Sequence, residues 1–198
     1  MPHILIIGGS DAGISAALRA RELDPASEVT IVVADRFPNF SICGLPFYLS
    51  GEVDDWHTLA HRTVLEIENE GVHLLLEHSV SSSDRMAKVV SISNRQGNTR
   101  DLGYDRLIIA TGAESIRPQA DGINLPGLFL LRWMDEAFAM QQYINERQPR
   151  SAIIVGGGYI GMEMADALTY RGIDVTVVEF FDSLLTTVDP ELGGKVQT

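Results

Sequence analysis

Cys43 is the only cysteine in this 198-residue chain, and it lies in the apolar stretch FPNFSICGLPFYLSG, residues 37–51. A cysteine thiolate is a nucleophile and a redox centre, whereas a buried thiol only fills space. One cysteine excludes an internal disulfide. A redox role would therefore pass through a mixed disulfide or persulfide with a small molecule, or through a sulfenic acid. The alternative is an inert thiol packed by Phe40, Leu45 and Phe47.

The stretch GGGYIG, residues 156–161, follows an apolar run and matches G-x-G-x-x-G. Gly156 permits a tight turn, Gly158 lets the backbone approach a pyrophosphate, and Gly161 lets a helix pack closely on a strand. With Tyr159 and Ile160 the loop opens a helix, whose N-terminal N–H groups and dipole favour phosphate. This context predicts a dinucleotide site.

Glu179 ends the next apolar run, 23 residues beyond Gly156. A carboxylate at this point accepts hydrogen bonds from a ribose diol and repels a 2′-phosphate. No Arg or Lys follows it in EFFDS. The second loop therefore predicts NADH over NADPH.

The stretch GGSDAG, residues 8–13, is an imperfect copy of the same loop. Gly8 and Gly13 are in place, but Ser10 holds the middle position, and Asp11 fits a helix N-cap role. The strand-end position is Val33, so the nearest carboxylate is Asp35. Taken alone, this loop leaves dinucleotide binding open, and its match with the second loop favours it.

Each loop lies in a longer repeat, residues 3–35 and residues 151–180. Each repeat runs from an apolar strand through the glycines into a helix and then into a β-branched strand. Continuous Val/Ile runs suit strands of a parallel sheet that is buried on both faces. The fold class is therefore α/β, with two Rossmann-like nucleotide-binding domains.

The remaining segments set the predicted domain limits. We expect a helix over 63–70, a strand over 72–76, and an antiparallel excursion around 86–92 that returns through 106–112 to the first sheet. We expect a further helix over 134–147. The first predicted nucleotide-binding domain is 1–113, the linker is 114–127, and the second nucleotide-binding domain is 128–198. Only nineteen residues follow Glu179. The second sheet is therefore expected to be incomplete, because the chain is cut short or a partner completes it.

The order and spacing of four motifs resemble the FAD-dependent pyridine nucleotide-disulfide oxidoreductases, in the single-cysteine branch that contains coenzyme A disulfide reductase, NADH oxidase and NADH peroxidase. These motifs are GGSDAG, SICGLPFYLSG, LIIATGA at 107–113 and VGGGYIGMEMA at 155–165. The short CGLPFYL is most similar to the coenzyme A disulfide reductase group. The resemblance covers residues 1–198 and implies a protein roughly twofold longer, with a C-terminal dimerisation domain and a homodimeric state.

The resemblance also implies a role for each matching residue. Cys43 lies against the flavin, and Glu163 lies near the nicotinamide. FAD contacts are implied for Gly8, Ser10, Ala12, Gly13, Asp35, Ser41, Val80, Ala110, Thr111 and Gly112. NADH contacts are implied for Gly156, Gly158, Tyr159, Ile160, Gly161 and Glu179. Substrate contacts are implied for Ser15, Arg19 and Asn39, although Glu22 and Ile42 are poor replacements for the groups that hold coenzyme A.

These residues favour an FAD- and NADH-dependent reductase of a small-molecule disulfide, coenzyme A disulfide, persulfide or polysulfide. Cys43 lies where a helix could begin, and a helix N-terminus stabilises a thiolate. An NADH oxidase or peroxidase with a Cys43 sulfenic acid is the alternative, with a peroxide as substrate. A nucleotide-binding fragment without turnover is another. His57 and His61 fit either an acid near the site or capping residues.

Composition excludes several classes. The net charge of −12, from 15 Lys+Arg against 27 Asp+Glu, offers no basic patch for nucleic acid or an anionic membrane. No apolar run reaches the roughly 18 residues of a transmembrane helix. The N-terminus lacks a signal-peptide pattern, so a reducing, cytoplasmic setting is expected. His73 and His78 lack partners at ligand spacing, so no metal is expected.

Overall fold

A computed structural model of the protein describes residues 1–197. Its contacts divide the chain into two compact units. The first unit comprises Met1–Ser41 and Ala60–Glu114. The second unit comprises Ile42–Leu59 and the chain from Ser115 onward.

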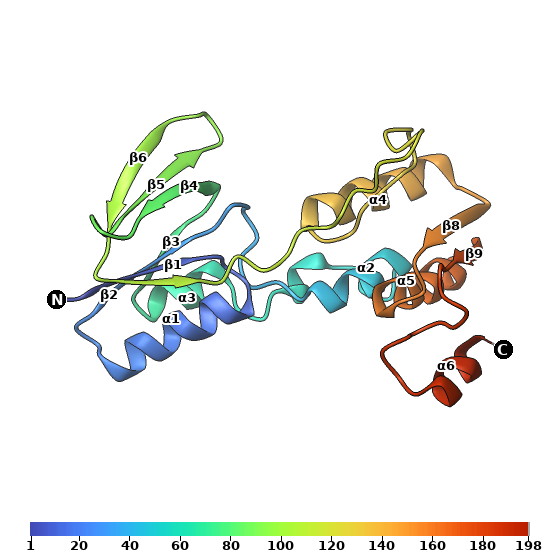
Figure 1. Ribbon diagram of the computed structural model, residues 1–198, viewed down its shortest axis with the longest axis horizontal. Coiled ribbons are helices and arrows are strands. Elements are labelled where there is room, and N and C mark those ends of the chain that lie inside the picture. Colours follow the sequence, from blue (N-terminus) through green and yellow to red (C-terminus); the bar gives the residue numbers. More distant parts are fainter. Residues whose placement is uncertain (198) are drawn as a thin grey trace. The chain divides into compact units, whose positions relative to one another are not determined.

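The first unit is built on a four-stranded parallel sheet with the strand order β3-β2-β1-β7 (Figure 1). It contains β1 (His3–Ile7), α1 (Asp11–Leu23), β2 (Glu28–Val32), α3 (Val64–Asn69), β3 (Val72–Leu75) and β7 (Arg106–Ile109). All three strand pairings are parallel. The predicted β-α-β repeat, the helix near residue 64 and the return of the chain to this sheet are confirmed.

A second, antiparallel sheet lies between β3 and β7 along the chain. It consists of β4 (His78–Asp84), β5 (Val89–Asn94) and β6 (Thr99–Gly103). Gly97, at φ 82°, makes the turn between β5 and β6, where only a residue without Cβ avoids strain. The predicted antiparallel excursion is therefore present.

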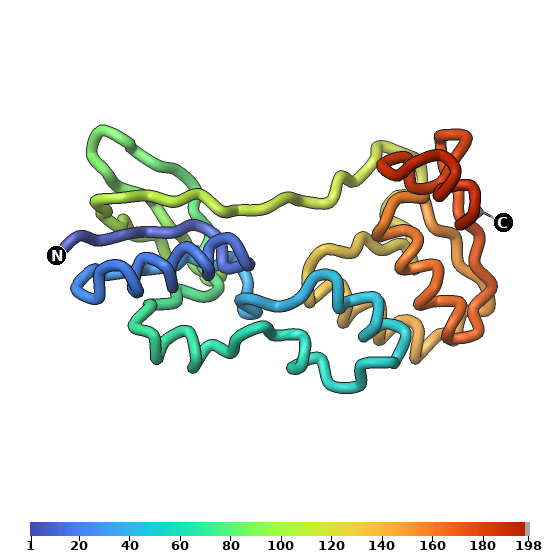
Figure 2. The backbone as a smooth tube through the Cα atoms, turned by 90° about the horizontal axis from the view of Figure 1, so that it is seen from below, coloured from blue at the N-terminus to red at the C-terminus, as the bar shows by residue number. Residues whose placement is uncertain are grey.

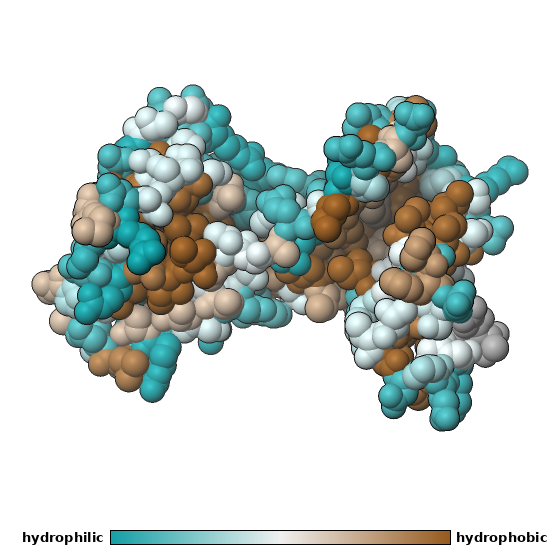
Figure 3. Space-filling view, viewed as in Figure 1, coloured by the Kyte–Doolittle hydropathy of each residue, from teal (hydrophilic) through white to brown (hydrophobic). Residues whose placement is uncertain are grey.

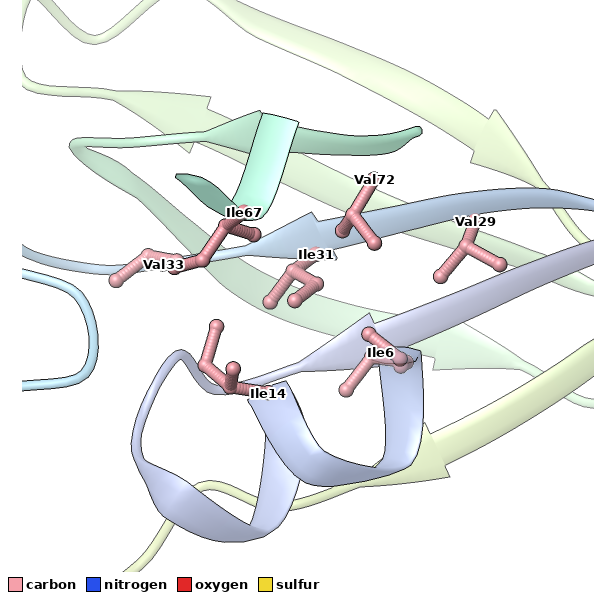
Figure 4. Close-up of a cluster of buried hydrophobic side chains, with 8 residues drawn as sticks. Ile6, Ile14, Val29, Ile31, Val33, Ile67 and Val72 are labelled. Atoms are coloured by element: carbon pink, nitrogen blue, oxygen red, sulfur yellow. The ribbon is translucent and has the colours of Figure 1, made fainter. Parts of the chain in front are cut away.

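Side chains of the parallel sheet alternate between two apolar layers. Ile6 and Ile31 point toward the helices α1 and α3, in a cluster that also contains Ile14 and Ile67 (Figure 4). Their neighbours Leu5 and Val32 point the other way, into a cluster with Val90 and Ile92 of the antiparallel sheet. Both faces of the sheet are covered, which is why its strands read as continuous apolar runs.

The second unit has a parallel pair, β8 (Ser151–Val155) and β9 (Asp174–Val178). Its helices include α4 (Met134–Arg147), α5 (Tyr159–Tyr170) and α6 (Pro190–Gln197). The bounds of α4 agree with the predicted helix. Residues 114–127, the predicted linker, contain no helix or strand.

Residues 42–59 pack with the second unit rather than with the remainder of the predicted domain 1–113. This segment forms η1 (Ile42–Gly44), α2 (Leu45–Ser50) and η2 (Trp56–Leu59). Helix α2 lies beside α5 in Figures 1 and 2 and contacts it. Leu49, fully buried, shares a cluster with Met164 and Leu168 of α5. The apolar face of a six-residue helix needs such a partner, because helices this short are unstable alone.

One face of β8 and β9 is open. Ile153 and Val155 are 72% and 83% exposed, and Val178 is 51% exposed. Apolar atoms are visible on the second unit in this region (Figure 3). Within residues 1–197 no further strand joins this pair, so the sheet is incomplete as expected. No helix in that range is long and apolar enough to cross a bilayer.

We predict that Ile31→Ala destabilises the first unit by about 2–5 kcal/mol, because the fully buried side chain leaves a cavity between the sheet and its helices. Urea unfolding followed by circular dichroism measures the change. Leu65→Ala, at a side chain that is 70% exposed on α3, is the control. It should change the free energy of unfolding by less than about 0.5 kcal/mol. Equal effects of the two substitutions would contradict the assigned core.

Candidate dinucleotide and thiol sites

The two glycine loops have the same local geometry. The N–H of Gly8 donates to the carbonyl of Val32 at 2.9 Å, and the N–H of Gly156 donates to the carbonyl of Val178 at 2.8 Å. Gly8 and Gly156 have φ values of 114° and 110°, which disfavour any side chain. Each loop therefore leaves its first strand by the same tight turn beside the end of the second strand.

The last glycine of each loop lets the helix touch the turn. A Cβ on Gly13 would lie 1.9 Å from the carbonyl oxygen of Gly8, and one on Gly161 would lie 2.0 Å from that of Gly156. No side chain fits at these distances. Both positions match the predicted role of close helix–strand packing.

The second loop has room for an anion. A Cβ on Gly156 or Gly158 would meet no atom within 4 Å. Gly158 is the N-cap of α5, whose first turn carries no side-chain cap and no acidic residue. Tyr159 and Ile160, 56% and 53% exposed, border the loop. The free N–H groups of the helix end thus face open space, which suits a pyrophosphate.

Glu179 is fastened to the second loop. One carboxylate oxygen accepts the N–H of Gly157 at 2.5 Å, and the other accepts the N–H groups of Phe180 and Phe181 at 2.7 and 3.0 Å. The N–H groups of Phe181 and Gly157, and then that of Phe180, lower the pKa of Glu179 below its ordinary value. The carboxylate therefore stays ionised beside the loop, where a ribose diol can donate to it.

Charged and polar groups crowd the first loop. The N-cap of α1 is Ser10 rather than Asp11, which is the first helical residue. The prediction of Asp11 as N-cap was therefore wrong by one position. The Asp11 carboxylate instead accepts a hydrogen bond from the side-chain amide Nδ2 of Asn39 at 2.7 Å. It also contacts the Nδ1 of His61 at 3.0 Å. These donors offset a negative charge that would oppose a pyrophosphate.

Asn39 connects the loop before Cys43 to the first glycine loop. It is 3% exposed and has a positive φ of 56°, which asparagine tolerates. Its backbone N–H donates to the carbonyl of Gly9 at 2.7 Å, and its own carbonyl accepts the N–H of His61 at 2.8 Å. Its Oδ1 is buried without a partner among the described residues. The other implied substrate contacts are exposed on α1, where Arg19 pairs with Glu22 at 2.6 Å and Ser15 faces solvent.

The ribose end of the first loop differs from that of the second. Val33 is 5% exposed, and its methyl groups fill the space next to Gly9. Asp35 lies two residues further on, and its Oδ1 accepts the N–H of Phe37 at 2.8 Å.

The segment 110–112, which holds three of the implied FAD contacts, packs against the first loop. Ala110 donates its N–H to Ile7 at 2.8 Å, and its carbonyl oxygen lies 2.1 Å from where a Cβ on Gly8 would be. The segment continues through the exposed Thr111 to Gly112, at φ 71°. Elsewhere in the first unit, Ala12 is exposed, Ser41 is half-buried, and Val80 packs against the cluster of Leu5, Val32, Val90 and Ile92.

Cys43 is exposed, so the alternative of a buried packing thiol was wrong. It lies in the 3-10 turn Ile42–Gly44, and α2 begins two residues later, with Gly44 as its N-cap and no side-chain cap. Leu45 and Leu49 are fully buried on the other side of this segment. The apolar residues of the stretch thus anchor α2, while the thiol stays accessible.

Glu163 on α5 faces α2. It lines a small hollow with Pro46 and Phe47, next to the carboxylates of Glu52 and Asp166. The helix that follows the second glycine loop therefore carries a carboxylate toward the helix that follows Cys43.

Arg171 is a positioning residue that sequence reasoning missed. Its Nη1 donates to the carbonyl of Leu49 at 2.9 Å and to the Oε1 of Gln141 at 2.6 Å. Its Nη2 donates to the Oδ1 of Asn145 at 2.6 Å. One guanidinium thus joins the end of α2 to α4 and α5. No local pattern indicates this role, because its partners are 26 to 122 residues away.

His57 pairs with Asp55, whose carboxylate also accepts the backbone N–H of His57 at 3.0 Å. Its Nδ1 lies 2.6 Å from the Oδ1 of Asp55, and its ring stacks on Trp56 at 3.7 Å. The hydrogen bonds from His57 lower the pKa of Asp55. Among residues 1–197 no cluster of three His, Cys, Asp or Glu side chains could hold a metal ion.

Comparisons with known proteins agree on one family. The family model described as pyridine nucleotide-disulphide oxidoreductase matches residues 2–198. An NADH oxidase of Methanocaldococcus jannaschii is 30% identical over 98% of this chain, and a coenzyme A disulfide reductase of Staphylococcus haemolyticus is also 30% identical over 98%. The crystal structure of reduced Bacillus anthracis CoADR-RHD matches 99% of the chain at 32% identity, with a TM-score of 0.96.

The chain spans 44% of each of these two relatives and 36% of the Bacillus anthracis chain. The likeness of sequence and fold therefore concerns only part of each of these longer proteins.

We predict that Glu179 makes the stability of the second unit pH-dependent. Its pKa is lowered by folding, so its contribution is present above its ordinary value of 4.5 and is lost as the pH falls below 4.5 through the lower folded value. The difference in free energy of unfolding between wild type and Glu179→Gln should therefore be constant from pH 7 to about pH 5.5 and shrink below that.

Urea unfolding followed by tryptophan fluorescence measures this difference, because both tryptophans, Trp56 and Trp133, lie in the second unit. A difference that stays the same from pH 7 down to pH 3 would contradict the assigned hydrogen bonds.

Proposed function

Because this chain belongs to the pyridine nucleotide-disulphide oxidoreductase family, we propose that it forms the N-terminal part of an FAD- and NADH-dependent reductase of small-molecule disulfides or persulfides. The observation that carries this proposal is the exposed Cys43 on a segment that packs against α5, the helix opened by the second glycine loop. An accessible thiol and a nucleotide loop within one compact unit are two of the parts that such a reductase needs.

We assign FAD to the first unit and NADH to the second. The turn at Gly8, the close packing at Gly13 and the uncapped start of α1 fit a pyrophosphate. The open Gly158 and the ionised Glu179 fit the pyrophosphate and the ribose diol of NADH. When bound, the flavin would carry two electrons from NADH to an oxidised Cys43.

Cys43 supplies the nucleophile. Its thiolate attacks one sulfur of the substrate disulfide, so that a Cys43–substrate mixed disulfide forms and the other half leaves as a thiolate. Two electrons and one proton then cleave the mixed disulfide into the Cys43 thiolate and a second substrate thiol. The N–H groups at the start of α2 favour the thiolate in both steps. For a persulfide the leaving group is hydrosulfide.

An NADH oxidase or peroxidase, in which Cys43 cycles through a sulfenic acid, is the second candidate, and the Methanocaldococcus relative named NADH oxidase favours it. The test compares NADH oxidation with coenzyme A disulfide, polysulfide, peroxide and oxygen as acceptors. Faster turnover with a disulfide or polysulfide supports the first proposal, and faster turnover with peroxide or oxygen supports the second. If a denatured extract of the purified protein contained no flavin, the alternative of a nucleotide-binding fragment without turnover would be supported.

We predict that Cys43→Ser lowers disulfide reduction by about a thousandfold or more, the scale expected when a nucleophile is removed. Flavin content and anaerobic bleaching by NADH should remain, because neither glycine loop is changed. The measurements are steady-state NADH oxidation and the flavin absorbance. Asp54→Ala, at an exposed side chain on the same segment, is the control for local disturbance. Full reductase activity in Cys43→Ser would exclude this cysteine and favour a reductase of another kind.

We also predict that Glu179→Gln reduces the preference of the second site for NADH over NADPH. The amide loses a charged acceptor for the ribose diol, which should raise the dissociation constant of NADH by roughly tenfold. The substitution also removes the repulsion of a 2′-phosphate. The dissociation constant of NADPH should therefore rise less than that of NADH. Fluorescence titration of the two nucleotides measures both constants, and an unchanged ratio would contradict the role of Glu179.

A further inference from the structure

The ends of β2 in the first unit and of β9 in the second unit are equivalent positions. In the first unit Ile7 pairs with Val32, and in the second Val155 pairs with Val178. The following residue is Val33 in one unit and Glu179 in the other. Because the register and the glycine turns match, these two residues occupy equivalent places.

Val33 and Glu179 face the same part of their loops, but one side chain is apolar and the other is a carboxylate. A Cβ on Gly157 would lie 3.2 Å from the Oε2 of Glu179, whereas one on Gly9 would lie 2.6 Å from a methyl group of Val33. The N–H of Gly157 donates to Glu179. The N–H of the buried Gly9 has no acceptor among the described residues. The first loop thus presents methyl groups and a donor where the second presents an anionic acceptor.

Asp35 does not restore the acceptor at this place. It lies two residues beyond Val33, and its Oδ1 closes a local turn by accepting the N–H of Phe37. The carbonyl of Asp35 accepts the N–H of Glu77 at 2.9 Å, which fixes the backbone along the start of β4. One oxygen of this carboxylate thus serves its own turn, two residues beyond the place that Glu179 holds in the second unit.

We infer that the first unit binds the adenosine end of its dinucleotide without recognising the ribose diol, and that Val33 is the residue that removes this recognition. The inference rests on the proposed assignment of FAD to this unit. The first site should therefore bind a dinucleotide whose adenosine lacks the 2′-hydroxyl as tightly as the natural one, whereas the second site should bind such an analogue more weakly.

The test titrates the flavin-free protein with FAD and with an FAD analogue built on 2′-deoxyadenosine, and follows flavin fluorescence. For wild type the two dissociation constants should agree within about twofold. The Val33→Glu variant should bind FAD about tenfold more tightly than the 2′-deoxyadenosine analogue, because the new carboxylate accepts a hydrogen bond from the 2′-hydroxyl. At the second site, NADH should bind about tenfold more tightly than its 2′-deoxyadenosine analogue, which serves as the internal reference.

A tenfold preference of the wild type for FAD would overturn the inference, whether or not Val33→Glu folds. If that preference disappeared in Asp35→Asn, the contact would belong to Asp35. If the flavin fluorescence showed no binding of either FAD or the analogue, the proposed function itself would be overturned. That outcome differs from equal binding of the two flavins, which supports the inference.

Discussion

The structure depends on a contact that only glycine allows. At Gly13 and at Gly161 a helix begins so close to the preceding turn that a Cβ would lie about 2 Å from a backbone oxygen. This approach places the first N–H groups of each helix at the carboxyl edge of a parallel sheet, where the strand ends also lie. Every nucleotide contact proposed for the two units starts from that edge.

The same scaffold holds the thiol in a different way. Helix α2 is too short to be stable alone. Its buried Leu49 packs on α5, and Arg171 donates a hydrogen bond to the carbonyl of Leu49 in its last turn. The carrier of Cys43 is thus tied to the helix of the second glycine loop. Burial of the apolar part of the stretch and exposure of its single sulfur are two results of one packing arrangement.

The two loops share their backbone but not their electrostatics. The second has an uncapped helix start and one carboxylate that is held ionised by three N–H groups. The first has a carboxylate at the helix start, tied by Asn39 and His61, and methyl groups at the strand end. A repeated fold can therefore serve two nucleotides, because its glycines set the geometry while single side chains set the selectivity.

Local features of the sequence determined the glycine turns, the parallel strands and the limits of α4. Each of these depends on residues within a few positions of one another, through φ, periodicity and Cβ clashes. The sequence also determined that Cys43 has no partner cysteine. The tertiary structure decided the exposure of the sulfur, the packing of residues 42–59 with the second unit, and the pairing of Asp11 with Asn39 and His61. These depend on contacts between residues 28 to 122 positions apart, and the free energy of such packing is not written in any local pattern.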